Sequence, residues 1–366
     1  MHVLQVTPRY PPNLGGVEIV VQKISELLVE SGIDVTVYTA DLSKGLPCQQ
    51  KINGVLVKRF APLYGDPLYL PEPKFVKHMR HEKIDIIHAH NTHILTPLFA
   101  SAFKHKKQRL VIQPHYHRFG QSPFRDCLLR LYAHLASRFI FSQADVTIAN
   151  SVYEKTILQE DFRKCRNIVL IPEGLDVVET SHVERNPATP ARILYIGALK
   201  GYKNVDKILN GFVWLARRNT AEPVKLIVVG TGPEHRSLVA RARDLRIDSL
   251  VEWKSGLTRQ QLLDEYAKAS ALVLLSPLES FSRVVYEALL IGVPLVVLNY
   301  GALASLVSAQ LAEGVNSFNE QEIAQALLRA MKRQSPKIPN SLGSFLDWRE
   351  YAKRIIRTYH EVLKEQ

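Results

Sequence analysis

The chain has 366 residues, of which 46% are hydrophobic and 22% are charged, the composition of an ordinary soluble globular protein. No apolar run approaches the ~18–20 residues that a membrane-spanning helix needs, so no membrane-spanning helix is expected. The length exceeds one typical core and favours two domains, and the formal net charge of +12 favours an anionic partner.

The positive charge is unevenly distributed. Between Lys74 and Arg138 there are twelve Lys and Arg against three Asp and Glu, a local excess of nine. An anionic membrane surface, a phosphorylated substrate or a nucleic acid would suit such a region, and so would a solvated basic face without a partner. Composition alone leaves these alternatives open.

The cysteines and the N-terminus bear on the compartment. Cys48, Cys127 and Cys165 are scattered, odd in number and form no CxxC pair, which favours a reducing compartment. The N-terminal stretch MHVLQVTPRYPP lacks a basic region followed by a long apolar run, so no signal peptide is predicted. We therefore expect a cytoplasmic protein.

The first part of the chain alternates short apolar runs with helical patterns. A strand is predicted at 2–6 and a turn-rich loop at 8–16, and apolar residues recur at near-helical spacing over 17–32. A second strand at 34–40 completes a strand–helix–strand unit, which is typical of a parallel sheet. Further strands are predicted at 54–60, 85–89, 110–114, 145–150 and 167–172, together with a helix at 128–143.

The same alternation restarts after a polar stretch at 177–191, which holds two prolines and is predicted to be an interdomain linker. The sequence thus predicts two tandem α/β domains, each a doubly wound, Rossmann-like parallel sheet, at 1–176 and 192–345, followed by a C-terminal segment at 346–366. Strands of the second domain are predicted at 192–199, 224–230, 249–255, 271–275 and 294–298, and helices at 204–218, 233–245, 258–269, after Glu279 and at 348–365.

Candidate functional residues are sought in the loops after strands, because ligands of open parallel sheets bind beyond the carboxyl ends of the strands. Gly15 and Gly16 precede the first helix, where backbone N–H groups can approach a phosphate, although turns also use glycine freely. His115 and His117 follow the strand at 110–114, where a histidine can be a base, a donor to substrate or a packed polar residue. A zinc site is disfavoured because no third ligand is near.

The second domain has its own loops of this kind. Lys200 and Lys203 follow its first strand and can reach a diphosphate, and Gly230 lies in a glycine turn that can equally be a tight strand-to-helix connection. Glu279 and Glu287 bracket the segment ESFSRVVYE, between a buried strand and the next helix. If that segment were helical throughout, the two carboxylates would lie ~10–12 Å apart and suit two ends of one extended ligand. This separation argues against a glycosidase-type acid pair.

In chain order, these motifs resemble those of the family 4 glycosyltransferases, retaining enzymes of the GT-B architecture. The motifs are PP-x-x-GGVE, a histidine after a mid-domain strand, IPEGLD, IGALKGYKNVDKIL, VVGTGP and Glu-x7-Glu followed by ALLIGVPLVV. The resemblance covers about residues 1–310, and the Glu-x7-Glu segment with its G-x-P-x-V tail is the most specific part. It implies two Rossmann-like domains that face a cleft, with the C-terminal helix packing back on the first domain.

The resemblance implies a role for each matching position in the second domain. Glu279 would contact hydroxyls of the transferred sugar, and Glu287 would contact the ribose of the donor. The backbone around Phe281, Ser282 and Arg283 would face the diphosphate at the start of a helix.

Further roles follow for the remaining positions. His115 would contact the sugar near its anomeric carbon, with His117 as the alternative. The Gly15–Gly16 loop would lie on the phosphate and acceptor side, with Gly16 also at the donor, and Gly230 would line the donor site. Lys203 would neutralise the leaving diphosphate in place of a metal, so neither a metal nor another cofactor is expected.

Four positions depart from the family pattern. Ala198 stands where an arginine is usual, Ala302 and Ser305 stand in a turn that usually carries glycine and an acid, and Ser282 replaces a frequent glycine. The departures are compatible with an altered donor geometry or with a homologue that binds without turnover.

The function that the resemblance implies is a retaining, metal-independent transfer of a hexose-type sugar from a nucleotide-diphosphate sugar to a hydroxyl acceptor. The acceptor would be lipid-linked or a saccharide, and the basic region at 74–138 adds an anionic membrane surface, with the protein peripheral at the inner face of the membrane. A nucleic acid partner is not expected. The alternatives are a non-catalytic sugar-nucleotide binder or partner subunit, and an epimerase of the same architecture. A nicotinamide dehydrogenase is disfavoured because the first strand-to-helix turn has no GxGxxG.

Overall fold

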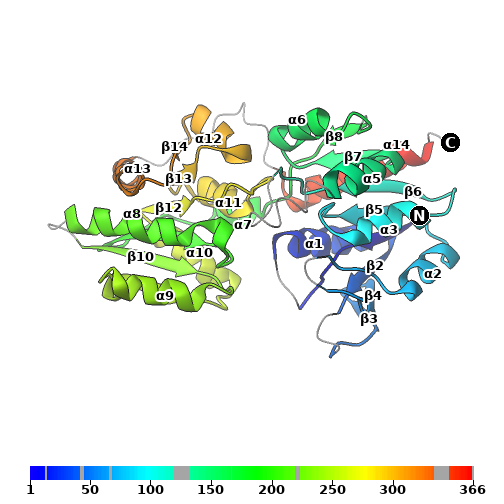
Figure 1. The fold of residues 1–366 in the computed structure, drawn as a ribbon, viewed down its shortest axis with the longest axis horizontal. Coiled ribbons are helices and arrows are strands. Elements are labelled where there is room, and N and C mark those ends of the chain that lie inside the picture. The colour runs from blue at the N-terminus through cyan, green and yellow to red at the C-terminus, as the bar shows by residue number, and fades with distance from the viewer. Residues whose placement is uncertain are drawn as a thin grey trace. The chain divides into compact units, whose positions relative to one another are not determined.

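The computed structural model describes residues 1–12, 15–41, 45–65, 68–118, 132–165, 167–218, 223–333 and 346–364, and the chain forms two compact units (Figure 1). Unit 1 comprises Met1–Gly174 and Leu346–Gln366, so it takes residues from both ends of the chain, and unit 2 comprises Leu175–Phe345. Cys127, the first residues of the helix predicted at 128–143 and the end of the domain predicted at 192–345 lie outside the described residues.

Unit 1 is built on an eight-stranded sheet in the order β3-β4-β2-β1-β5-β6-β7-β8. Its pairings are parallel except that β3 runs antiparallel to β4. The short strand β3 was not predicted, because three of its four residues, QQKI, are polar and none is fully buried. The strands are β1 His2–Val6, β2 Asp34–Ala40, β3 Gln49–Ile52, β4 Val55–Phe60, β5 Ile86–His90, β6 Arg109–Gln113, β7 Val146–Ala149 and β8 Ile168–Leu170.

Helices cover both faces of the unit 1 sheet. One face packs against α1 (Gly16–Glu30) and α14 (Trp348–Lys364) in a continuous apolar core. The C-terminal helix is therefore part of unit 1 (red in Figure 1). The other face packs against α2 (Pro73–His81), α3 (Leu95–Phe103), α5 (Arg138–Gln143), which continues a π-helix at Ala133–Ser137, and α6 (Val152–Asp161).

Unit 2 is built on a six-stranded parallel sheet in the order β11-β10-β9-β12-β13-β14, the order of a doubly wound nucleotide-binding fold. The predicted fold class, two doubly wound α/β units, is thus confirmed. The short strand β14 was not predicted, because AEGV carries little apolar pattern. The strands are β9 Ala191–Ile196, β10 Val224–Val229, β11 Val251–Lys254, β12 Ala271–Leu274, β13 Leu295–Leu298 and β14 Ala312–Val315.

The helices of unit 2 include one where a linker was predicted. The stretch 177–191 is not a free linker, because α7 contacts α11, and the N–H groups of Asn186 and Ala188 donate to the carbonyls of Ala267 and Lys268. A helix of five residues, VVETS, is too short to show a period. The helices are α7 Val177–Ser181, α8 Val205–Arg218, α9 His235–Asp244, α10 Arg259–Lys268, α11 Arg283–Ile291, α12 Ala304–Ser308 and α13 Glu320–Lys332, with 3₁₀ turns at Gly201–Lys203, Asp248–Leu250 and Gly301–Leu303.

Within the described ranges, no helix combines the length and the apolar character needed to cross a bilayer.

Candidate functional site

The sheet of unit 2 brings Lys203 and Glu279 together. These residues follow β9 and β12, which are adjacent strands at the point where the strand order reverses. The Lys203 Nζ and Glu279 Oε1 atoms are 2.5 Å apart, and the two side chains are only 15% and 12% exposed. Burial alone would lower the pKa of Lys203, but the carboxylate of Glu279 outweighs it and raises that pKa. The ammonium group of Lys203 therefore keeps its charge at neutral pH.

A second contact fixes the loop that carries Lys203. Asn204 adopts a left-handed conformation, with φ of 55°, and its side-chain amide donates to the carbonyl of Leu275 at 2.8 Å. Because Leu275 directly follows β12, the loop after β9 is tied to the strand that leads to Glu279.

The segment between the two glutamates is not a continuous helix, contrary to the geometry assumed from the sequence. The helix α11 begins at Arg283, and Ser282 before it has a φ of 80°, in the left-handed region. Phe281 is buried and stacks on Tyr286, with ring centroids 4.4 Å apart. Ser282 makes no side-chain cap, so its side chain does not occupy the N–H groups at the start of α11.

Glu287 lies on α11 and is 7% exposed. Both of its carboxylate oxygens accept from Arg259 Nη1, at 3.0 and 3.1 Å, and the hydroxyl of Tyr266 donates to it at 3.1 Å. Arg259 also donates to Glu179 of α7 at 2.7 Å. Arg259 was not predicted, since no local pattern links it to a glutamate 28 positions away.

The two glutamates of the Glu-x7-Glu segment thus have different partners. Glu279 pairs with Lys203 at the switch point, and Glu287 pairs with Arg259 of α10. Each carboxylate is held in one orientation, as a group that contacts one defined part of a ligand must be.

A pocket of about 230 Å³ opens beside Gly230. Gly230 has a φ of 153°, and a Cβ added there would lie 1.9 Å from the carbonyl oxygen of Gly197. A Cβ on Gly232 would similarly lie 2.3 Å from the carbonyl oxygen of Leu199. The glycines therefore let the loops after β9 and β10 approach each other. The pocket is lined by Gly230, Thr231, Gly232, His235, Trp253, Lys254 and Ser255.

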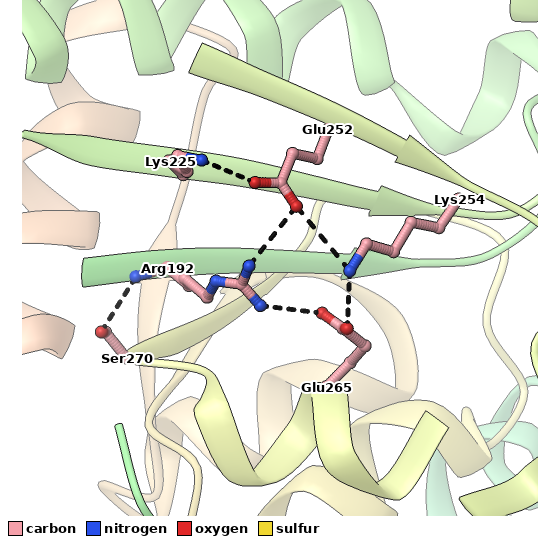
Figure 2. Close-up of polar contacts among 6 residues, drawn as sticks. All are labelled: Arg192, Lys225, Glu252, Lys254, Glu265 and Ser270. Carbon is pink, nitrogen blue, oxygen red and sulfur yellow. Dashed lines mark hydrogen bonds and ion pairs between the residues drawn. The ribbon is translucent and has the colours of Figure 1, made fainter. Parts of the chain in front are cut away.

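An ion-pair network holds Lys254 at the edge of this pocket. Figure 2 shows charged side chains from three neighbouring strands converging near α10, which supplies Glu265. Lys254 Nζ lies 2.7 Å from Glu265 and 3.7 Å from Glu252, and Arg192 lies 3.4 Å from each of these glutamates. Lys225 donates to Glu252 at 2.8 Å, which is the main reason that the pKa of Glu252 is lowered. The network fixes the edge strand β11 against β10 and α10.

In unit 1, His115 follows β6 in a left-handed conformation, with φ of 48° and 9% exposure. Its Nδ1 atom is 3.3 Å from Asn150 Nδ2 and 3.5 Å from Glu173 Oε1. The ring stacks on that of His90, with centroids 6.0 Å apart. Among the described residues, none bonds to the buried Nε2 atom of His115, which leaves that atom for a ligand.

Glu154 of α6 holds the backbone around His115. Its carboxylate accepts from the N–H groups of Tyr116 at 2.5 Å and Asn150 at 2.7 Å. Burial raises the pKa of Glu154 to about 7, although the two backbone donors oppose that rise. One side chain thus joins the loops after β6 and β7, from which His115 and Asn150 project.

The other histidine of the motif has different surroundings. The N–H group of His117 donates to His93 Nε2 at 3.3 Å, and the two rings lie 4.1 Å apart. The ring of His117 thus lies against His93, and that of His115 lies beside Asn150 and Glu173. The roles predicted for the two histidines remain predictions.

Gly15 and Gly16 begin α1, as predicted. Gly15 is the N-cap in extended conformation without a side-chain cap, and a Cβ on Gly16 would meet nothing within 4 Å. A Cβ on Gly15 would lie 2.3 Å from Glu18, whose carboxylate accepts from Arg9 at 2.8 Å. The Arg9–Glu18 pair beside this loop is a feature that the sequence analysis missed.

The described residues include no group of three or more His, Cys, Asp or Glu side chains arranged to hold a metal ion.

Two family models match the chain, Glycosyltransferase Family 4 over residues 14–179 and Glycosyl transferases group 1 over residues 178–353. The chain belongs to the family 4 glycosyltransferases. The resemblance stated from its motifs is therefore confirmed. The boundary between the two models, near residue 178, falls close to the boundary between the two structural units at residues 174 and 175.

Relatives within and around this family differ in what they act on. The chain is 25% identical over 254 residues to mannosylfructose-phosphate synthase of Agrobacterium fabrum, covering 62% of the chain and 56% of that protein. It is 20% identical over 381 residues to a phosphatidylinositol N-acetylglucosaminyltransferase subunit of Saccharomyces cerevisiae, covering 96% of the chain and 81% of that protein. The chain spans between 45% and 62% of the length of three of its curated relatives, the Agrobacterium protein among them.

The fold has solved counterparts. Sucrose-phosphate synthase from Thermosynechococcus elongatus matches with a TM-score of 0.78 at 17% identity, covering 100% of both chains. At this identity the likeness shows the fold alone, which is the GT-B glycosyltransferase fold.

Proposed function

We propose that this protein transfers a hexose-type sugar from a nucleotide-diphosphate sugar to a hydroxyl group of an acceptor. The observation that carries the proposal is the Lys203–Glu279 pair, which stands at the strand-order switch of unit 2 beside the uncapped start of α11. Ligands of such sheets bind at this point, and both charges of the pair have a use in sugar transfer.

The donor diphosphate would bind where positive charge is already arranged. The ammonium group of Lys203 and the N–H groups at the start of α11 would stabilise the negative charge that develops on the leaving diphosphate. The carboxylate of Glu279 would accept hydrogen bonds from sugar hydroxyls and so orient the sugar relative to the diphosphate. We propose on this basis that the reaction needs no metal or other cofactor.

The retaining course is part of the same proposal. The acceptor hydroxyl would attack the anomeric carbon on the face from which the diphosphate departs. The acceptor proton would pass to the leaving diphosphate, so that the bond to the acceptor forms as the bond to the diphosphate breaks. The protein would contribute position and electrostatic stabilisation, not a covalent nucleophile. His115, with its open Nε2 atom, would contact the sugar near the anomeric carbon.

The nucleoside would occupy the remaining features of unit 2. The pocket beside Gly230 has the polar and aromatic lining that suits a base, with Trp253 and His235 in its wall. Glu287 would accept from the ribose hydroxyls, and Arg259 would hold its carboxylate in place while that bond forms.

We further propose a lipid-linked acceptor at an anionic membrane surface, with the protein peripheral on the cytoplasmic side. Unit 1 combines the basic region 74–138 with exposed apolar side chains, a combination that favours the interface of an anionic bilayer. The yeast relative named for phosphatidylinositol supports the same choice over a soluble saccharide. The exposed apolar residues include Leu63, Tyr64, Leu68 and Phe103.

The first experiment is a thermal-shift screen with UDP-, GDP- and ADP-sugars, followed by a transfer assay with each sugar that binds. A ligand that binds only the folded state raises the melting temperature. We expect one nucleotide to raise it clearly and the Glu279→Ala variant to lose turnover. No shift with any of them would contradict the proposed function.

The second experiment tests the membrane part alone. Co-sedimentation with vesicles that contain anionic phospholipid should decrease as salt rises, because the attraction between surface charges is screened. Binding to neutral vesicles at the same level would contradict the proposed surface, while leaving the donor chemistry untouched.

A non-catalytic sugar-nucleotide binder remains the second candidate, and Ala198 and Ser305 favour it. Ala198 uses its backbone carbonyl to accept from Tyr195, and Ser305 donates to the carbonyl of Ala302, so neither supplies charge to a phosphate. A thermal shift without hydrolysis or transfer would identify a binder. Conversion of the donor sugar into its epimer in the absence of an acceptor would identify an epimerase.

A further inference from the structure

The C-terminal helix α14 presents two fully buried tyrosines to polar side chains of the unit 1 sheet. Tyr359 lies with its hydroxyl 2.7 Å from His88 Nδ1 and accepts from Gln5 Nε2 at 3.3 Å. Tyr351, two helical turns earlier, donates its hydroxyl hydrogen to Gln113 Oε1 at 3.1 Å. Gln113 ends β6, two residues before His115.

A chain of hydrogen bonds runs from Tyr351 to His115. Gln113 Nε2 donates to Asn150 Oδ1 at 2.6 Å, and Asn150 Nδ2 lies 3.3 Å from His115 Nδ1. All four residues are at most 9% exposed. Buried polar networks of this kind hold one arrangement, because each unsatisfied group would cost free energy.

The direction of the chain decides which nitrogen of His115 carries hydrogen. A side-chain amide accepts with its oxygen and donates with its nitrogen. Because Gln113 accepts from Tyr351 with its oxygen, it turns its nitrogen to Asn150, and Asn150 in turn presents its own nitrogen to His115. His115 Nδ1 must then accept, which places the hydrogen on Nε2.

The opposite direction would require the Tyr351 oxygen to accept from Gln113. Its hydroxyl hydrogen would then lose Gln113 Oε1, the acceptor that the described residues provide. A competing group acts at the other end, since Glu173 Oε1 lies 3.5 Å from His115 Nδ1 and favours hydrogen on Nδ1. Tyr351 and Glu173 therefore favour different tautomers of the same ring.

We propose that Tyr351 is a positioning residue that, through Gln113 and Asn150, holds His115 in the tautomer with hydrogen on Nε2. The buried Nε2 atom, which has no partner among the described residues, is thereby presented to the substrate as a hydrogen-bond donor. The use of that donor rests on the proposed function, in which His115 contacts the transferred sugar. The tautomer itself does not depend on it.

The test is nitrogen NMR of the full-length protein with ¹⁵N-labelled histidine, in which the His115 signals are assigned by their loss in His115→Gln. The wild type should show a protonated Nε2 and an unprotonated Nδ1. Tyr351→Phe removes only the hydroxyl group, and we expect the His115 signals to move toward the tautomer with hydrogen on Nδ1. Gln113→Met breaks the same chain one step later and should have the same effect, which covers the case that Tyr351→Phe does not fold.

Tyr359→Phe is the matched control, since it is the same substitution on the same helix. It should leave the His115 signals in place and change those of His88, with which Tyr359 bonds. The proposal is overturned if wild-type His115 carries its hydrogen on Nδ1. It is equally overturned if Tyr351→Phe and Gln113→Met leave His115 unchanged, or if Tyr359→Phe moves it as far.

Kinetics separates this inference from the proposed function. If Glu173 then favours the other tautomer tenfold and the donor binds both tautomers equally, Tyr351→Phe should lower kcat about 10-fold with the donor KM unchanged, because only the molecules with hydrogen on Nε2 react. Full activity of His115→Gln would remove His115 from the proposed transfer and leave the tautomer result standing. An unchanged His115 tautomer in Tyr351→Phe and Gln113→Met would contradict the proposed role of Tyr351, even if sugar transfer is demonstrated.

Discussion

The two units hold their candidate functional residues by different means. In unit 1, the hydrogen bond nearest to the His115 ring comes from a neutral, buried amide, that of Asn150, with the carboxylate of Glu173 slightly farther from the same nitrogen. In unit 2, Glu279 is oriented by a salt bridge with Lys203, and Glu287 by one with Arg259. A neutral network fixes the direction of each hydrogen but requires each ring to stay in one protonation state. A salt bridge requires only that both partners remain charged.

The histidines sharpen this difference. His88, His90 and His93 lie inside unit 1, and burial lowers the pKa of each of them, that of His88 to about 3. The histidines of unit 2, His182 and His235, are exposed. Lowering the pH should therefore destabilise unit 1 before unit 2. Removing a single charged side chain should have its largest effect in unit 2.

The largest expected effect is on transfer in unit 2. Glu279→Gln keeps the shape of the side chain but removes the charge that faces Lys203, and we expect the transfer rate to fall by about 10²–10³-fold. The measurement is kcat with the nucleotide sugar that binds. Glu313→Gln is the control, because Glu313 is also paired, with Arg329 at 2.7 Å, but lies on the edge strand β14. Similar losses of kcat in Glu279→Gln and Glu313→Gln would show that transfer depends on paired charges in general and not on the Lys203–Glu279 site.

The next effect compares two glycines of the predicted donor site. Gly230→Ala places a Cβ against the backbone of Gly197 and should cost about 3 kcal/mol or more in the free energy of unfolding. Gly16→Ala meets no atom within 4 Å and should stay within about 0.5 kcal/mol. Urea unfolding measures both. If Gly16→Ala weakens donor binding at unchanged stability, Gly16 contacts the ligand and is not needed for the fold.

The sequence predicted most of the strands and several of the longer helices. The alternating strands and the helices α1 and α14 follow from runs of apolar residues, and their observed bounds are close to those predicted. Among the elements missed, β3, β14 and α7 are four or five residues long and carry few apolar side chains. The longer helix α13 was also missed, although its 13 residues bury one apolar face. The start of α11 was misplaced because it depends on the left-handed conformation of Ser282, which no periodicity shows.

The site residues were predicted through the family motif, whereas their partners were not. Lys203 and Glu279 both belong to motifs, but their contact depends on β9 and β12 being neighbours in the sheet. Arg259 and Tyr351 belong to no motif, and Tyr351 reaches Gln113 from 238 positions away. Such pairings are set by the tertiary fold, so one sequence without its structure cannot reveal them.

A smaller effect concerns pH. Below the ordinary histidine pKa of 6.5, the unfolded chain binds protons that His88, His90 and His93 do not bind in the folded protein, so unit 1 loses stability as pH falls from 6.5 toward 3. Glu154 acts in the opposite sense, because its raised pKa of about 7 favours protonation in the folded state. The sum should be a loss of about 2 kcal/mol between roughly pH 6.5 and 5.5.

The three tryptophans allow this loss to be assigned to one unit. Trp348 reports on unit 1, and Trp214 and Trp253 report on unit 2. Fluorescence-detected urea unfolding of the Trp214→Phe/Trp253→Phe variant should move with pH, and that of Trp348→Phe should move less. Equal shifts would mean that the histidines of unit 1 do not set the acid sensitivity.

The smallest effect tests the ion-pair network of unit 2. Glu265 has a side chain 9% exposed and two cationic partners, so Glu265→Gln should cost about 1–2 kcal/mol in unfolding free energy. Lys225 is 37% exposed, and Lys225→Ala should cost less than about 0.5 kcal/mol. Solvent ions screen exposed ion pairs more than buried ones. High salt should therefore reduce the cost of Lys225→Ala and leave most of the cost of Glu265→Gln. If high salt removes the stability cost of both substitutions, the ion pairs at this edge of unit 2 behave as ordinary surface charges. The contrast with the buried network of unit 1 would then hold only for the Lys203–Glu279 and Arg259–Glu287 pairs.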